Sequence, residues 1–149
     1  MATAQRVPAP AAERSGAVRL MRIGAVIYVI GLVLHTADHI RRGTGVISPE
    51  VFWLGIVSTA AGLATVALIA ARHRLAPLAA SLLGIPVAVG VAAVHLPPYW
   101  GVLSDPFTGS RTAGITPFSW FVVLVEIAGA ALLGAAALVA LGRRDAAAE

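Results

Sequence analysis

The residues of this sequence that could carry chemistry are a few histidine and acidic side chains set in otherwise apolar stretches. His35, Asp38 and His39 are three and four residues apart, a spacing that places all three on one face of a helix. Two histidines at positions i and i+4 can bind one metal ion, and zinc, copper and iron accept imidazole and carboxylate ligands. This set predicts a metal site, although the H-x-x-x-H pattern alone is common on helices.

Two later apolar segments carry further candidates at a comparable depth. Glu126 follows Phe118 by eight residues, or about 12 Å of helix, and His35 precedes Arg41 by six residues, or about 9 Å. His95 ends its own apolar run. We therefore predict one metal or haem site, with no residue assigned a catalytic role, formed by His35, Asp38, His39, His95 and Glu126 and supported by the polar side chains of Tyr28, Ser58 and Thr59.

Zinc, copper or iron is one hypothesis for the cofactor, and haem b is the other. A haem would take one axial histidine from the first apolar segment and His95 from the third. Gly31, Gly84, Ala88 and Ala92 could open a slot for it, but small residues also line most contacts between transmembrane helices. The sequence lacks the H-E-x-x-H pattern of metalloproteases and the many histidines of membrane di-iron enzymes. We therefore assign neither chemistry.

The elements that position these residues are apolar segments long enough to cross a membrane. Hydrophobic residues make up 58% of the 149 positions and charged residues 12%, whereas soluble domains carry about 25% charged residues. A helix of about 20 residues crosses the hydrocarbon core. The sequence therefore predicts an all-α, polytopic membrane protein, a bundle of four transmembrane helices over residues 19–41, 51–71, 75–96 and 118–141. The absence of cysteine excludes disulfides and thiolate metal sites.

The chain organisation follows from these spans. We predict a single transmembrane domain over 17–142, preceded by a disordered cytoplasmic tail over 1–16 and followed by a cytoplasmic tail over 143–149. A secretory signal is the competing interpretation of the N-terminus, but the residues after Leu34 form a poor cleavage site. The long loop over 97–117 is expected to fold over the nearby end of the bundle as a lid.

Arginine placement predicts the orientation, because basic residues near helix ends stay on the cytoplasmic side. With four spans, eight arginines fall on the side of the termini and three on the opposite side. All three tryptophans then lie at outer helix ends, where interfacial aromatics anchor. We therefore predict that the protein lies in the plasma membrane with both termini in the cytoplasm. The high isoelectric point of about 11.1 reflects this topology, and no nucleic-acid partner is expected.

Three classes of function remain open from the sequence. The first is a membrane protein that binds a transition metal or haem for redox, carrier or catalytic use. The second is an accessory or assembly subunit whose polar cluster only sets helix packing. The third is a proton-coupled transporter. The expected partners are the lipid bilayer and either another membrane protein or a second copy of this chain.

Overall fold

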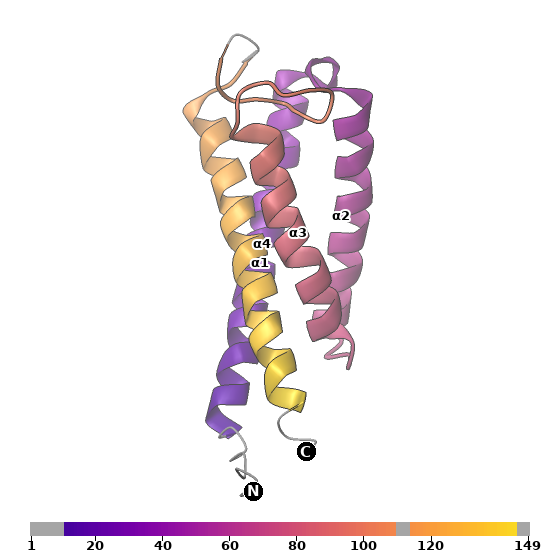
Figure 1. The fold of residues 1–149 in the computed structure, drawn as a ribbon, viewed down its shortest axis with the longest axis vertical. Coiled ribbons are helices and arrows are strands. Elements are labelled where there is room, and N and C mark those ends of the chain that lie inside the picture. The colour runs from indigo at the N-terminus through magenta and orange to yellow at the C-terminus, as the bar shows by residue number, and fades with distance from the viewer. Residues whose placement is uncertain (1–10, 110–113, 146–149) are drawn as a thin grey trace, which may run out of the picture.

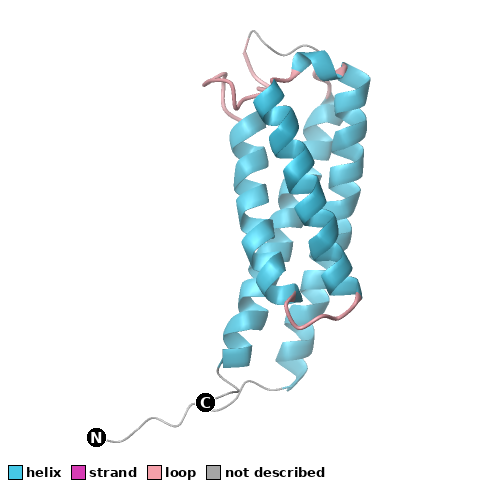
Figure 2. Cartoon of the chain, turned by 90° about the vertical axis from the view of Figure 1, so that its right-hand side faces the viewer, coloured by secondary structure: helices cyan, strands magenta, loops and turns pink. Residues whose placement is uncertain are grey.

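The structure is a computed structural model that describes residues 11–109 and 114–145. Within these ranges the secondary structure is helical and contains no strand. Four long helices run alternately up and down, and both ends of the described chain lie at the same end of the bundle (Figures 1 and 2). We call this the terminal end and the opposite one the loop end. The helices are α1 (Ala11–Arg42), α2 (Pro49–Ala70), α3 (Ala76–His95) and α4 (Pro117–Asp145), with a short 3-10 turn η1 (Thr44–Val46).

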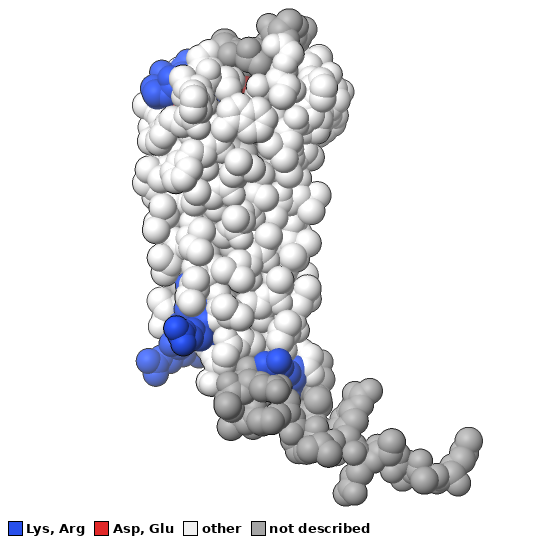
Figure 3. Space-filling view, turned by 90° about the vertical axis from the view of Figure 1, so that its left-hand side faces the viewer, with Lys and Arg blue, Asp and Glu red and all other residues white. Residues whose placement is uncertain are grey.

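All four helices are long and apolar enough to cross a membrane. Their most apolar windows have mean hydropathies between 1.9 and 2.4. One face of the molecule shows a broad band without charged side chains, with arginines at both ends (Figure 3). The prediction of an all-α chain is confirmed for the described residues, as is that of four helices able to span a membrane.

The helix boundaries differ from the expected spans mainly at the chain termini. Helix α1 begins at Ala11, within the predicted tail, because the alanine, glutamate and arginine residues that follow favour helix. Helix α4 continues to Asp145, beyond the expected end of the fourth span. Residues 1–10 and 146–149 lie outside the described residues.

Helices α1 and α4 form the centre of the bundle. They approach so closely at Gly31 that a Cβ atom there would lie 2.5 Å from the backbone nitrogen of Glu126. Only glycine permits this approach, which sets α1 and Glu126 side by side. Tyr28, Val122 and Leu133 are among the fully buried side chains of the bundle. The pair therefore provides the rigid frame of the candidate site.

Helix α2 is the least buried of the four helices. Its most apolar window is 17% buried, against 50% for α4. The helix starts at a regular N-cap, where the hydroxyl of Ser48 accepts a hydrogen bond from the Val51 amide at 3.1 Å. The Ser48 hydroxyl also donates to the carbonyl of Val102. The beginning of α2 is thereby attached to the loop that follows α3.

That loop lies across the loop end of the bundle (Figure 1). Its described part is held down by hydrogen bonds to α3: the Asp105 amide donates to the Val94 carbonyl at 3.0 Å, and the Phe107 amide donates to the His95 carbonyl at 2.9 Å. Phe107 is 4% exposed. The described part of the loop therefore covers the end of α3, as expected for a lid.

Candidate metal centre

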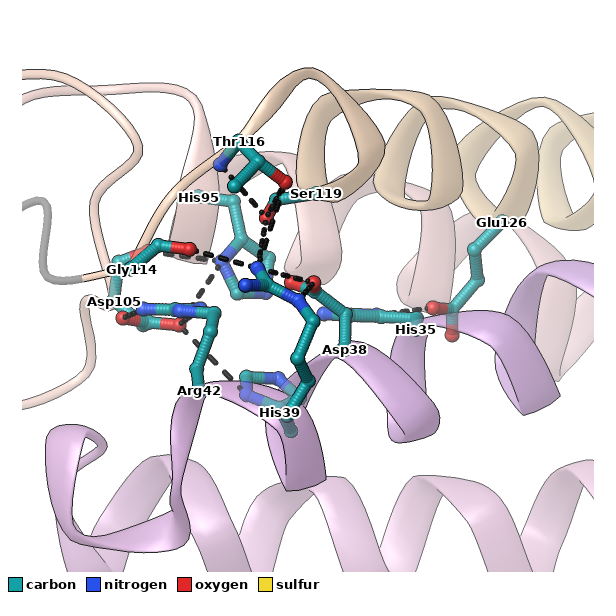
Figure 4. A network of polar contacts seen from close by, with 11 residues as sticks. His35, Asp38, His39, Arg42, His95, Asp105, Gly114, Thr116, Ser119 and Glu126 are labelled. Carbon is teal, nitrogen blue, oxygen red and sulfur yellow. Dashed lines mark hydrogen bonds and ion pairs between the residues drawn. The ribbon is translucent and has the colours of Figure 1, made fainter.

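Three histidines from two helices meet beneath this loop. His35 and His39 lie one turn apart on α1, and His95 is the last residue of α3. Their ring centroids are 4.6 Å apart for His35 and His39, 4.8 Å for His35 and His95, and 5.8 Å for His39 and His95. One ring nitrogen of each lies within 4.8 Å of the others, so the three histidines could hold a metal ion. We call them the histidine cluster (Figure 4).

Two of the rings are oriented by acceptors elsewhere in the protein. Nδ1 of His95 donates to the carbonyl of Asp105 at 2.9 Å, and since a carbonyl only accepts, this nitrogen carries the proton. Nδ1 of His35 donates to Oε2 of Glu126 at 2.5 Å. With a single proton on each ring, at Nδ1, both rings would keep the lone pair of Nε2 for another ligand. Metal-binding histidines are typically fixed in this way by a carboxylate or carbonyl behind the ring.

Two ring nitrogens of the histidine cluster lack hydrogen-bond partners within the described part of the chain. Nε2 of His35 and Nδ1 of His39 are buried and have no hydrogen-bond partner among the described residues. Leaving such a group unsatisfied costs about 1–3 kcal/mol, and buried polar groups are normally paired. A ligand at the centre of the cluster would satisfy both atoms.

Asp105 connects the loop to the cluster. Its carboxylate accepts two hydrogen bonds from Arg42, each 2.7 Å long, and both side chains are almost fully buried. Oδ2 of Asp105 lies 3.6 Å from Nδ1 of His95 and 3.9 Å from Nδ1 of His39. The ring of Phe107 packs on His95 with centroids 4.6 Å apart. The loop therefore places one carboxylate and one aromatic ring against the histidine cluster.

Asp38 belongs to a neighbouring network between α1 and α4. Its Oδ1 accepts from Nε of Arg41 at 2.9 Å and from Nη2 at 2.8 Å. The same Nη2 donates to the Gly114 carbonyl at 2.7 Å and the Ser119 hydroxyl at 3.2 Å. Asp38 is fully buried. This network joins the start of α4 to the end of α1 next to the histidine cluster.

Of the five predicted ligands, the structure brings three together and places two outside the histidine cluster. His35, His39 and His95 come together, Glu126 stands behind His35, and Asp38 pairs with Arg41. Whether these residues bind metal stays a prediction, and so does the supporting role of three polar residues. Tyr28 is 1% exposed and lies lower in the bundle, while Ser58 and Thr59 are half-buried on α2.

Sequence reasoning did not assign a site role to Asp105, Phe107 or Arg42. One signal was available, because Asp105 is the sole acidic residue between Glu50 and Glu126 and lies in the loop that begins just after His95. The loop geometry that brings Asp105 to Arg42 depends on tertiary contacts, which residue spacing does not encode.

The space that a haem would need is filled by helix packing. A Cβ on Gly84 of α3 would lie 2.6 Å from the Ala130 carbonyl oxygen and from the Gly134 nitrogen of α4. Gly31 makes the corresponding contact with Glu126. The imidazoles of His35 and His95 face each other in an edge contact with no macrocycle-sized gap between them. The described residues therefore suit a single ion better than a haem.

A single ion requires only a small contraction of the cluster. Nitrogen ligands bind zinc at about 2.0–2.1 Å, which puts tetrahedral donors about 3.3 Å apart. The donors here lie within 4.8 Å of one another, and rotation of the imidazoles would bring them closer. Three histidines would leave a fourth coordination position open, as in catalytic zinc sites.

Comparison of the chain with protein-family models, with curated proteins and with solved structures found no match.

Proposed function

We propose that this chain is a multi-pass membrane protein that binds one transition-metal ion through His35, His39 and His95. The observation that carries the proposal is the orientation of the rings. The acceptors behind His35 and His95 hold Nδ1 as a donor, so that Nε2 of each ring is available as a ligand. A cluster that only packed helices together would have no need to leave Nε2 of His35 buried without a hydrogen-bond partner among the described residues.

The charges around the cluster also favour a cation. Three carboxylates are buried at this end, those of Asp38, Asp105 and Glu126. Arg41 and Arg42 pair with the first two, which leaves the charge of Glu126 next to His35. An uncompensated charge in a low-dielectric interior is costly. A metal ion bound to the side of the His35 ring that faces away from Glu126 would balance the charge of Glu126. The ring and its hydrogen bond to Glu126 would connect the two charges.

The donor set favours zinc or copper among the metals considered. Three imidazoles without a carboxylate ligand suit zinc and copper. The two-histidine, one-carboxylate arrangement typical of non-haem iron would need Glu126 or Asp105 in the inner shell. Both carboxylates are instead engaged, one with His35 and the other with Arg42.

We also propose that both termini face the cytoplasm, with the histidine cluster in the outer half of the plasma membrane. Five arginines with described side chains lie at the terminal end or in the short α2–α3 turn: Arg19, Arg22, Arg72, Arg74 and Arg143. The two at the loop end, Arg41 and Arg42, are paired with carboxylates. This asymmetry follows the rule that basic residues are retained inside.

Metal content is the test of the proposed function. Protein purified in detergent without chelators, then reconstituted with zinc or copper and desalted, should hold about one ion per chain by elemental analysis. His35→Ala, His39→Ala and His95→Ala should each lose most of it. His73→Ala is the matched control, because His73 is the fourth histidine of the chain and lies in the α2–α3 turn.

Two results would contradict the proposal. Less than about 0.2 ion per chain after reconstitution would show that the cluster does not bind metal under conditions that fill three-histidine sites. Equal metal content in His73→Ala and in the three cluster variants would show binding elsewhere. In either case the cluster would serve helix packing, as expected for an accessory or assembly subunit.

A further inference from the structure

One face of α2 packs against the bundle at both ends but not in the middle. The face is a stripe at helical spacing, and its members are Val51, Gly55, Ser58, Gly62, Thr65 and Ile69. Val51 is buried near the loop end, and Gly62, Thr65 and Ile69 are buried toward the terminal end. Gly55 is exposed, and a Cβ added there would meet nothing within 4 Å. We call the space beside Gly55 and Ser58 the α2 hollow.

The segment that borders this hollow is exposed around its whole circumference. All six residues over 52–57 are exposed, and six successive residues go more than once around a helix. Phe52, Trp53 and Val57 are 39%, 63% and 67% exposed. Lipid covers the outward faces of such a segment in a membrane, but the inward face of a packing stripe needs another occupant.

The α2 hollow lies at the depth of the histidine cluster. Gly55 is six residues from the start of α2 and His35 is seven residues from the end of α1, so both lie about 9–10 Å below the loop end. The side chain of His39 is 20% exposed, more than that of His35 or His95. Figure 4 shows His39 on the side of the cluster away from Ser119 and Glu126 of α4. The cluster is therefore most open on a side that α4 does not cover.

The direct route from water is closed by the loop. Asp105 and Phe107 cover His95, and the buried Arg42 holds Asp105 in place. At the floor of the hollow the hydroxyl of Tyr28 lies against Gly62. Tyr28 is 1% exposed, and its hydroxyl has no hydrogen-bond partner among the described residues.

We propose that the α2 hollow admits a lipid-soluble small molecule, with an oxygen-donor head group on an apolar body, which reaches the metal ion sideways from the bilayer. The inference rests on the proposed metal site, because the head group would take the open coordination position. The apolar body suits walls that contain Gly55 and exposed apolar residues of α2. The unpartnered hydroxyl of Tyr28, which lies against Gly62 of the same α2 stripe, suits a ligand with a polar function.

The test uses protein loaded with Co(II), whose visible absorption reports its coordination, in lipid nanodiscs. Decanohydroxamate and acetohydroxamate carry the same metal-binding head group, and only the first partitions into the bilayer. We expect decanohydroxamate to change the Co(II) spectrum at concentrations at which acetohydroxamate does not. Gly55→Leu should fill the hollow and weaken this response about tenfold or more while leaving the Co(II) spectrum itself unchanged.

Gly142→Leu is the matched control, because Gly142 lies on α4 at the terminal end and a Cβ there also meets nothing within 4 Å. It should respond to decanohydroxamate as the wild type does. An equal response of Gly55→Leu and the wild type would overturn lateral access through the α2 hollow. So would a response to acetohydroxamate as strong as that to decanohydroxamate.

A measurement without metal separates this inference from the proposed function. A decanol bearing an aliphatic diazirine, photolysed with the metal-free protein, should label residues within 51–59 of α2, and Gly55→Leu should lose these adducts. Failure to bind Co(II) would overturn the metal site and with it the coordination step. Absence of labelling at 51–59 would overturn the hollow as a ligand site. Disulfide-linked dimers of Gly55→Cys formed at high yield would show that a second copy fills it.

Discussion

Replacement of Glu126 by glutamine should weaken metal binding without weakening the fold. The carboxylate of Glu126 accepts a 2.5 Å hydrogen bond from Nδ1 of His35, and both side chains are buried. Glutamine keeps an acceptor oxygen in the same place but removes the charge that strengthens the His35 ligand and balances the ion. Loss of such a supporting partner typically lowers metal affinity 10–100-fold, which corresponds to about 1.4–2.7 kcal/mol.

The metal-free variant should unfold close to the wild-type temperature. The hydrogen bond to His35 survives, and the variant no longer buries a carboxylate whose charge lacks an arginine partner. We therefore expect a change of about 3 °C or less, roughly 1 kcal/mol for a chain of this size. Affinity is measured by competition with a chromogenic chelator, and stability by thermal unfolding with and without metal.

Glu50→Gln is the matched control, because Glu50 is exposed in the first turn of α2, outside the site. Its metal affinity should equal that of the wild type. A Glu126→Gln affinity within about twofold of the wild type would refute the role of Glu126 behind His35. A large loss of stability in the metal-free state, with unchanged affinity, would instead assign Glu126 to helix packing.

The remaining predictions concern the contact of α1 with α4, the loop over the histidine cluster and the orientation of the protein in the membrane. Gly31→Ala should destabilise the bundle by about 1–3 kcal/mol, because its Cβ would collide with the α4 backbone at 2.5 Å, whereas Gly55→Ala, in open space, should unfold like the wild type. Equal unfolding temperatures for the two variants would refute the close contact of α1 and α4. Arg42→Gln should speed amide hydrogen exchange in the loop over 97–109 about tenfold or more, because it breaks a buried bidentate ion pair, and unchanged exchange would show that the pair does not hold the loop. A green fluorescent protein fused to the C-terminus should fluoresce in cells, and a substituted cysteine within 43–48 should react with an impermeant reagent added outside; the reverse pattern would contradict cytoplasmic termini.

The four helices were predictable because their length and composition carry the signal. Each apolar segment is long enough to span the hydrocarbon core, and a backbone surrounded by lipid must satisfy its own hydrogen bonds. The helix boundaries at the chain ends were less predictable, since α1 extends to Ala11 through residues that are polar but favour helix. Polarity at a helix end does not distinguish a tail from a helix that leaves the membrane.

The histidine cluster was partly predictable for the same kind of reason. The spacing of His35 and His39 fixes their common face whatever surrounds them, and the helix length places Glu126 at their depth. The separation of the histidine cluster from Asp38 and Glu126 was not predictable. It depends on the direction of each side chain, and the contact of Gly31 with the Glu126 backbone brings that carboxylate behind His35.

The supporting role predicted for Ser58 and Thr59 depends on how closely α2 packs against the other helices. Ser58 and Thr59 have the residue types and depth of supporting polar groups, but they lie on the helix that is least buried in the bundle. The Ser58 hydroxyl donates to the carbonyl of Gly55 within its own helix, at 3.0 Å. Depth along a helix can be counted from sequence, whereas distance between helices depends on packing over the whole bundle.

X-ray absorption at the edge of the bound metal identifies its ligands. We expect three nitrogen ligands at about 2.0–2.1 Å, with the more distant scattering of imidazole rings, in wild-type protein and in His73→Ala. His95→Ala should lose one of these imidazoles. A first shell made only of oxygen ligands, or imidazole scattering unchanged by His95→Ala, would contradict binding of the metal by the histidine cluster.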